Sequence, residues 1–457
     1  MKLTAGIIII LVLVLGAGFL IKLWSTPTVE PRPTPPPADL GGQAPPPVVP
    51  PPVQPPPPIT PPPQTQAGID FGNKVTGLLS RVEDARDGQS VRAVIVQRVS
   101  SLGSVYLMMR VMWHEVEPTP NNFNFADIDS FLREVAGTNI KPVFIIKAGE
   151  ATWATAPNQN KLTYCEEKGI EKEIEGEKGG TKEEGKNSFP PKDLNEYKDF
   201  LKTLVNRVKP KVKNFAIENE PGGCFFMGDV NQYSTLVKAA SETIKSVCAD
   251  CKISIEAGHN MVGREQNRDY PLRFGLGDLK NLGTLRYVDD LGFHCNDKPS
   301  GCDLLEVAKT TGITAGFNLP VWQTESGEDD DLKALTLAKR AAVAFANGAA
   351  VFFNSDGQSV LDPHPRNRSY RPAAYTSLKV LIQKLQYSRF ISRSGNIYKF
   401  QKAGRPIFVA WSDAPQTVSF CSEISGTVLI THIDGQTNTI DCNSVALSAE
   451  PIYIENR

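Results

Sequence analysis

The middle of the chain alternates short apolar runs with amphipathic segments. Seven apolar runs have the length of buried strands, and stretches with helical periodicity lie between them. Strict alternation of this kind predicts a parallel sheet covered by helices, and an eighth strand between Ile69 and Val96 would close it into a (β/α)₈ TIM barrel. The predicted strands are 104–113, 141–149, 212–220, 252–260, 289–296, 319–326 and 349–355, and the predicted helices are 127–137, 193–209, 232–247, 303–313 and 332–348.

The pattern changes from about Ser388, where apolar and polar residues alternate between Gly, Asp and Asn turns and no helical period is left. This pattern predicts a small antiparallel β-sandwich. We expect it to pack on the barrel rather than to bind sugar, because its single tryptophan, Trp411, lies in a strand. The predicted strands are 396–401, 405–412, 417–421, 427–433 and 451–456.

The chain starts with a segment long enough to cross a bilayer. Leu3 to Ile21 is almost wholly apolar and is flanked by Lys2 and Lys22, which gives a helix of about 19 residues. A cleaved signal peptide is the alternative, but it would have a shorter apolar region, and "LGAGFLIKLW" offers a poor cleavage site. We therefore expect an export signal that stays as a membrane anchor.

Proline dominates the next segment, from Pro27 to Pro63. Such a sequence forms no core and adopts extended polyproline II, so it predicts a stalk that could reach ~100 Å, at ~3.1 Å per residue. A charged, glycine-rich insertion follows the third predicted strand, as a solvated excursion or a lid over the barrel mouth. The predicted organisation is 1–24 signal anchor or signal peptide, 25–67 linker, 68–387 barrel with the insertion around 154–190, and 388–457 sandwich.

Charge and cysteine content add two constraints. Lys and Arg (49) balance Asp and Glu (50) for a net charge of −1, so the chain carries no electrostatic footprint for nucleic acid. Eight cysteines in an exported chain suggest disulfides. "CADC" is alternatively half of a zinc site, but no second pair at zinc spacing accompanies it. Proximity along the chain favours the pairs Cys248–Cys251, Cys295–Cys302, Cys421–Cys442 and Cys165–Cys224.

Polar residues interrupt the apolar runs where the predicted strands end. In a parallel barrel these ends meet on one face, so we expect their side chains to line one cavity. Each unpaired polar group buried in an apolar wall costs a few kcal/mol, roughly, and an active site is the simplest explanation for several. The residues are Arg110, Lys147, Asn219, Glu220, His259, Asn260, His294 and Glu325.

Two carboxylates on separate strands are what glycosidic cleavage requires. One stays protonated and gives its proton to the leaving oxygen, and the other is ionised and attacks the anomeric carbon. Arg110 would hold Glu325 in its anionic form, while Glu220, next to that anion and partly desolvated, would keep its proton.

Four motifs resemble clan A glycoside hydrolases over most of residues 105–385, and the nearest branch contains the xylosidases and iduronidases, which also carry a C-terminal β-domain. "RVMWHEVEP" is similar to their second-strand region, "IENEP" to their acid/base motif, "GFHC" to their sixth strand and "PVWQTESG" to their nucleophile motif. The resemblance implies that Glu220 is the acid/base, that Glu325 is the nucleophile, and that Asn219 contacts the sugar 2-hydroxyl. His294 would lie near Glu325 or the substrate.

The chain departs from that pattern at three places, which concern the substrate more than the reaction. Glu218 replaces a common aromatic residue, and we expect it to pair with a basic neighbour. Lys147 ends the third strand where a histidine is common, and it either favours an acidic sugar or neutralises the carboxylates. The eighth strand, "AAVFFNSDG", lacks a tryptophan.

We therefore predict a membrane-tethered, extracytoplasmic, monomeric retaining glycosidase whose partner is a carbohydrate and which uses no metal or other cofactor. Catalytically lapsed carbohydrate binding and transglycosylation are the alternatives. The predicted catalytic residues are Glu220 and Glu325, and the predicted substrate-binding residues are Arg110, Trp113, Lys147, Trp153, Asn219 and His294.

Overall fold

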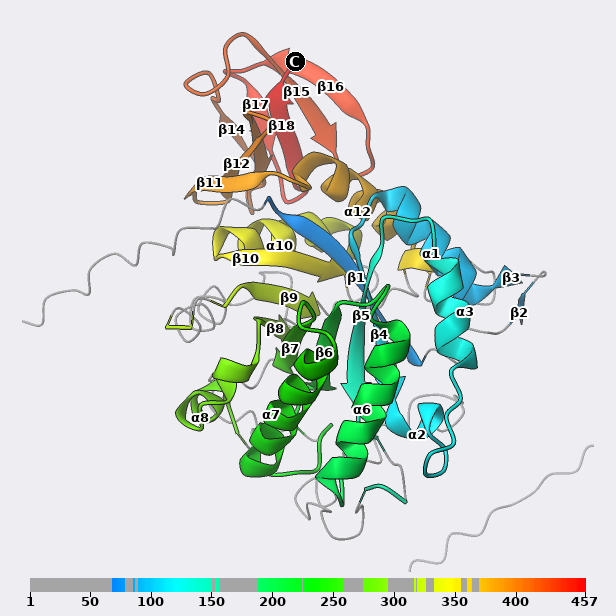
Figure 1. The fold of residues 1–457 in the computed structure, drawn as a ribbon. Helices are drawn as coiled ribbons and strands as arrows, with labels where there is room; N and C mark the ends of the chain where they lie inside the picture. Colours follow the sequence, from blue (N-terminus) through cyan, green and yellow to red (C-terminus); the bar gives the residue numbers. More distant parts are fainter. Residues whose placement is uncertain are drawn as a thin grey trace, which may run out of the picture. The chain divides into compact units, whose positions relative to one another are not determined.

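A computed structural model provides the fold (Figure 1). It describes residues 68–78, 85–86, 89–149, 153–155, 188–223, 225–257, 274–294, 316–317, 319–325, 333–354, 360–363 and 370–457. The predicted membrane segment, the proline-rich linker, most of the charged insertion and the predicted helix at 303–313 lie outside these residues. Within the described part of the chain, no helix is both long and apolar enough to span a membrane.

Eight parallel strands form a closed barrel in the order β1-β10-β9-β8-β7-β6-β5-β4, which confirms the predicted (β/α)₈ architecture. All seven predicted strands are present, and the eighth is β1, within the range where the pattern required it. The strands are β1 Asp70–Leu78, β4 Tyr106–Met112, β5 Lys141–Lys147, β6 Asn214–Asn219, β7 Lys252–Ala257, β8 Asp290–His294, β9 Val321–Glu325 and β10 Ala349–Asn354.

Amphipathic helices cover the outside of the barrel (Figure 1). Capping side chains set where two of them begin: Asp193 accepts from the backbone N–H of Asn195 (2.7 Å), and Asp229 forms a capping box with Gln232. Four predicted helices are confirmed as α3 Ala126–Glu134, α6 Leu194–Val208, α7 Val230–Val247 and α10 Lys333–Ala346. The pattern did not predict α1 Val91–Leu102, α2 Trp113–Val116, α8 Leu276–Asn281, the 3-10 helix η3 Thr284–Tyr287 or α12 Pro372–Leu385.

Strand alternation separates two apolar layers. Residues facing the helices, such as Leu107, Phe144 and Ile255, belong to one large buried cluster. Residues facing the barrel axis, such as Met108 and Ile145, form a second, smaller cluster that fills the interior. The interior is therefore packed with side chains, so its polar groups have little access to water.

An antiparallel region follows the barrel, as predicted. A six-stranded sheet runs β11-β12-β13-β18-β15-β16, and β14 and β17 form a two-stranded sheet. Trp411 is buried and stacks on Tyr398, which confirms its expected core position. The strands are β11 Arg389–Ser394, β12 Ile397–Lys402, β13 Arg405–Ala410, β14 Gln416–Val418, β15 Thr427–His432, β16 Thr437–Asp441, β17 Val445–Leu447 and β18 Ile452–Asn456; a short hairpin pairs β2 Ala85–Arg86 with β3 Gln89–Ser90.

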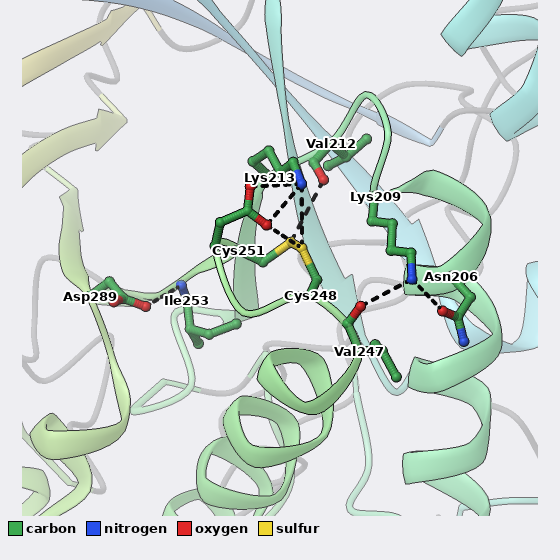
Figure 2. The surroundings of a disulfide bond; sticks show 10 residues. Asn206, Lys209, Val212, Lys213, Val247, Cys248, Cys251, Ile253 and Asp289 are labelled. Carbon is green, nitrogen blue, oxygen red and sulfur yellow. Dashed lines mark hydrogen bonds and ion pairs between the residues drawn. A yellow bond between two sulfur atoms is a disulfide. The ribbon is translucent and has the colours of Figure 1, made fainter.

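Two of the four predicted disulfides are confirmed, Cys248–Cys251 and Cys421–Cys442. The other two pairs lie outside the described residues. The first disulfide closes the turn between α7 and β7, where Lys209 also donates to the backbone oxygen of Val247 (Figure 2). This turn precedes the start of a barrel strand, so it lies at the amino end of the barrel.

Candidate active site

Three strands bring acidic and basic side chains to the carboxyl end of the barrel. Glu220 directly follows the last residue of β6, His294 is the last residue of β8, and Glu325 is the last residue of β9. His294 and Glu325 are also paired in register between β8 and β9. The sequence predicted that these three residues would lie together, and the structure brings them together.

His294 lies between the two predicted catalytic carboxylates. Its Nδ1 is 2.5 Å from Oε1 of Glu220 and 3.4 Å from Oε2 of Glu325. The imidazole is fully buried, whereas the carboxylate side chains are 18% and 21% exposed. The two glutamates therefore keep some exposed surface while they share one buried nitrogen.

A third carboxylate, which the sequence analysis missed, completes the cluster. Oε2 of Glu256 on β7 lies 3.1 Å from Nε2 of His294, and the Glu256 side chain has no exposed surface. The signal was present in the sequence, since Ser254 and Glu256 alternate with Ile253 and Ile255 along the strand. The sequence analysis instead chose His259 and Asn260 beyond this strand, and both lie outside the described residues.

The backbone at the end of β6 is irregular. Glu218 and Glu220 both have left-handed φ angles, 62° and 44°, and the pairing register of β6 with β7 shifts between Ile217 and Asn219. The N–H of Glu220 donates to the backbone oxygen of Glu256 at 3.0 Å, which fixes the displaced segment. Left-handed backbone costs roughly 1–3 kcal/mol at a residue other than glycine, and it concentrates at functional sites.

Glu218 lies inside the barrel wall rather than in the cluster around His294. Its Oε1 accepts hydrogen bonds from the backbone N–H of Ala148 and the hydroxyl of Ser188, both at 2.8 Å. Burial raises the pKa of Glu218, and the positive charge of Lys147 opposes that rise, as do both hydrogen bonds. This placement agrees with the expectation of a structural carboxylate beside a basic residue.

Lys147, the last residue of β5, is buried and places its charge against Glu218. Of its two predicted roles, the structure therefore favours neutralising a carboxylate over binding an acidic sugar. A buried ammonium group needs such a partner, because desolvating an unpaired charge costs several kcal/mol, on the order of the stability of a domain.

Trp113 does not reach the exposed side of the site, so the structure argues against its predicted contact with substrate. The ring is fully buried, stacks on Phe200, and its Nε1 donates to Oε2 of Glu117 at 2.7 Å. Trp153 is only partly buried and packs edge-on against Trp113, with Nε1 3.3 Å from the backbone oxygen of Glu117. Trp113 therefore packs against Trp153 from the protein interior. A role for Trp153 in substrate binding stays a prediction.

Two further predicted residues lie on strands that border the site. Arg110 is half-buried in β4, level with Ile145 of β5, and Asn219 is a mostly buried residue in register with Glu256. Their roles as charge partner of Glu325 and as sugar contact stay predictions.

Metal-ligand geometry occurs at two places among the described residues, and neither is in this site. Each combines an aspartate with two cysteines: Asp250 with Cys248 and Cys251, and Asp441 with Cys421 and Cys442. All four sulfur atoms are joined in disulfides, so they offer no thiolate to a metal.

Comparison with solved structures places the fold among glycoside hydrolases. A family 39 glycoside hydrolase from Bacteroides cellulosilyticus WH2 superposes with a TM-score of 0.65 at 16% identity, covering 86% of this chain and 81% of that chain. A family 5 glycoside hydrolase from Bacteroides vulgatus gives 0.52 at 12% identity (85% and 88% covered), and a glucosidase from Croceicoccus marinus gives 0.50 at 13% identity (86% and 96% covered). No protein-family model and no curated protein matches the chain. The resemblance to clan A glycoside hydrolases is thus confirmed at the level of the fold, and the protein has the barrel of these enzymes.

Proposed function

We propose that the protein is a retaining glycoside hydrolase in which Glu220 is the acid/base and Glu325 is the nucleophile. The observation that carries this proposal is the convergence of both carboxylates on Nδ1 of His294. Since Glu220 lies 2.5 Å and Glu325 3.4 Å from that atom, their nearest oxygens are no further apart than the sum, about 5.9 Å. This bound brings both carboxylates within reach of one anomeric centre. Retaining enzymes separate the two carboxyl groups by roughly 5–5.5 Å and inverting enzymes by roughly 6.5–9.5 Å, and the stereochemistry of the first product decides between the two.

The chemistry proceeds in two displacements. Glu220 gives its proton to the glycosidic oxygen while an oxygen of Glu325 bonds to the anomeric carbon, and the bond to the leaving sugar breaks. Glu220, now a carboxylate, takes a proton from water as the water oxygen bonds to the anomeric carbon and Glu325 is released. Arg110, Asn219 and Trp153 are the proposed substrate contacts.

The stereochemistry of the first product tests the proposal. A panel of aryl glycosides identifies a hydrolysed sugar, and proton NMR in the first minutes then shows which anomer forms before the anomers equilibrate. We expect the anomer of the substrate, and a 2-fluoro glycoside should label Glu325 covalently. An inverted anomer would remove the retaining assignment.

Variants separate the two glutamates. Glu220→Ala should hydrolyse aryl glycosides with good leaving groups and give, with azide, a glycosyl azide of retained configuration, whereas Glu325→Ala should not hydrolyse them and should give, with azide, the inverted glycosyl azide. Glu196→Gln, an exposed glutamate in the first turn of α6, is the matched control and should behave as wild type. Sugar binding without turnover across the panel would instead support the lapsed carbohydrate-binding alternative, and sugar transfer would support transglycosylation.

We also propose that the protein acts outside the cytoplasm as a monomer tethered through residues 1–24. The apolar stretch at the start of the sequence and the two disulfides support this, because disulfides persist in oxidising compartments. Protease treatment of intact cells should release residues 68–457 by cleavage in the linker. Full protection from the protease would contradict the proposal.

A further inference from the structure

Glu256 has no role in the two displacements, yet it is the most buried carboxylate of the cluster around His294. The side chain has no exposed surface, and a buried carboxylate is retained only where charge or hydrogen bonds compensate it. Its Oε2 lies 3.1 Å from Nε2 of His294, on the side of the ring opposite the catalytic carboxylates.

The neighbouring strand makes room for Glu256. A side chain at Gly292 of β8 would place its Cβ 2.3 Å from Oε1 of Glu256 and 2.8 Å from the hydroxyl of Thr324. No Cβ tolerates such distances, so the glycine between Asp290 and His294 is the residue that fits beside this carboxylate. Glycine at position 292 of β8 thus leaves room for the Glu256 side chain of β7. This fit indicates that the contact between Glu256 and His294 is part of the architecture of the site.

The charges around His294 decide its protonation. Glu220 and Glu325 face Nδ1, and Glu256 faces Nε2. Asp290 of β8 and Tyr233 of α7 are also close to Glu256. Burial raises the pKa of both, and the negative charge of Glu256 adds to the rise, for Tyr233 after that of Glu218. An ionised carboxylate only accepts hydrogen bonds, so an imidazole with carboxylates at both nitrogens is best satisfied when both nitrogens carry protons.

We propose that Glu256 is a positioning residue that keeps His294 doubly protonated, so that its Nδ1–H serves as one donor shared by the two catalytic carboxylates. The inference rests on the proposed function. Before the reaction Nδ1–H donates to ionised Glu325 while Glu220 carries the acid proton. In the covalent intermediate Glu325 is esterified and uncharged, and the same N–H donates to the Glu220 carboxylate.

Both oxygens lie close to the same nitrogen, Glu220 in a hydrogen bond at 2.5 Å and Glu325 in an ion pair at 3.4 Å, so the exchange requires a shift of the Glu325 carboxylate toward Nδ1 and no new partner. His294 keeps both protons throughout. The proton that Glu220 loses to the leaving oxygen is replaced by the proton from water, so the cycle balances without His294 as a carrier. The N–H follows the negative charge as it moves from one carboxylate to the other.

The test measures the imidazole itself. In the full chain labelled with ¹⁵N-histidine, the signal of His294, assigned by its loss in His294→Gln, should report a doubly protonated ring at pH 7 in wild type. In Glu256→Gln, whose amide keeps the shape without the charge, the ring should be neutral at pH 7. A neutral ring in wild type at pH 7, or a ring unaffected by Glu256→Gln, would overturn the proposal.

Kinetics provide the second readout. Glu256→Gln should lower kcat by about 10²-fold, at the lower end of what a positioned proton donor contributes, with KM unchanged. In Glu256→Gln, the alkaline limb of the pH–activity profile should move to lower pH. Glu256→Asp should restore part of the lost kcat. A structural defect alone would lower kcat without shifting the pH dependence of activity.

The two proposals can fail separately. The protonation of His294 is measured without substrate, so it stands or falls even if no glycoside is hydrolysed. If Glu256→Gln does not fold, the wild-type titration alone decides the outcome. Glu196→Gln is again the matched control, and its histidine spectrum should be that of wild type.

Discussion

The two ends of the barrel handle charged side chains in different ways. At the amino end, Lys245 pairs with Asp289 and Lys213 pairs with Asp250, each at 2.9 Å and near the surface. At the carboxyl end, three carboxylates surround the single buried imidazole of His294. Ion pairs near a surface contribute a little stability, whereas crowded acids in a dry site oppose folding and indicate function.

The largest contrast should come from removing a charge at the carboxyl end. We expect Glu325→Gln to lower turnover by roughly 10³-fold or more, about 4 kcal/mol of transition-state stabilisation, because the amide is no nucleophile. The midpoint temperature of thermal unfolding should be unchanged or slightly higher, because the variant removes one of the crowded negative charges. Lys245→Ala at the amino end should keep full turnover, and a similar loss of activity there would end the contrast.

Breaking the Lys147–Glu218 pair should have the largest effect on stability. Lys147→Met leaves Glu218 as a buried carboxylate without its counter-charge, for which the expected loss is about 3–5 kcal/mol of unfolding free energy. Chemical denaturation followed by circular dichroism measures it. The double variant Lys147→Met, Glu218→Gln should recover most of the loss, and recovery of none would show that the two residues are not coupled.

The disulfide at the amino end should contribute less. The Cys248–Cys251 bond closes a short loop, with a sequence separation of 3, so replacing both cysteines by serine should cost about 2 kcal/mol. Activity on an aryl glycoside should be preserved, because the turn lies at the opposite end from His294. A loss of turnover in the folded variant would mean that the two ends are coupled.

The smallest effects, with opposite signs, are expected at the adjacent residues Asp289 and Asp290. Burial would raise the pKa of Asp289, but hydrogen bonds from Lys245 and the N–H of Ile253 outweigh it, so the pKa falls below the usual 3.8. Burial raises the pKa of Asp290 well above 3.8, and the charges of Glu256 and Asp289 add to the rise. Asp289 therefore stabilises the fold above its usual pKa, and that contribution disappears in acid.

Asp290 has the reverse dependence, since its contribution is complete below 3.8 and is lost as the pH rises toward its raised pKa. At pH 7 we expect Asp289→Asn to lower, and Asp290→Asn to raise, the free energy of unfolding by about 1 kcal/mol each. The Asp290 difference should vanish below pH 3.8, and the Asp289 difference should disappear as the pH falls through its lowered pKa. Denaturant titrations at several pH values measure them, and equal signs at pH 7 would refute the assignment.

Much of the fold could be predicted because its periodicities are strong. The runs that became β4 to β10 are apolar on both faces, as strands buried between an interior and a helical layer must be. The strand β1 had only an approximate position, because "DFGNKVTGL" has few apolar residues and two glycines. The helix α1 was missed because its apolar residues are not confined to one face of the helix.

Parts of the site could also be predicted, because strand ends meet at one face. Glu220, His294 and Glu325 were chosen on that ground, and they share one contact point. Glu256 was missed because it lies one residue before the end of its strand. Only the alternation of inward and outward side chains along the strand indicates that it points into the barrel. Trp113 had two predictions, a substrate contact and a core position, because an aromatic residue after a strand suits both, and its burial and packing against Phe200 favour the core.

The left-handed backbone at Glu218 and Glu220 places these two residues under two conflicting demands. Glycine or asparagine would suit this geometry better, so each glutamate is retained for a reason other than backbone conformation. Glu218 offsets the buried charge of Lys147, and Glu220 is the proposed acid/base. A related chain that lacks the proposed catalysis should therefore tolerate glycine at the position of Glu220 sooner than at the position of Glu218.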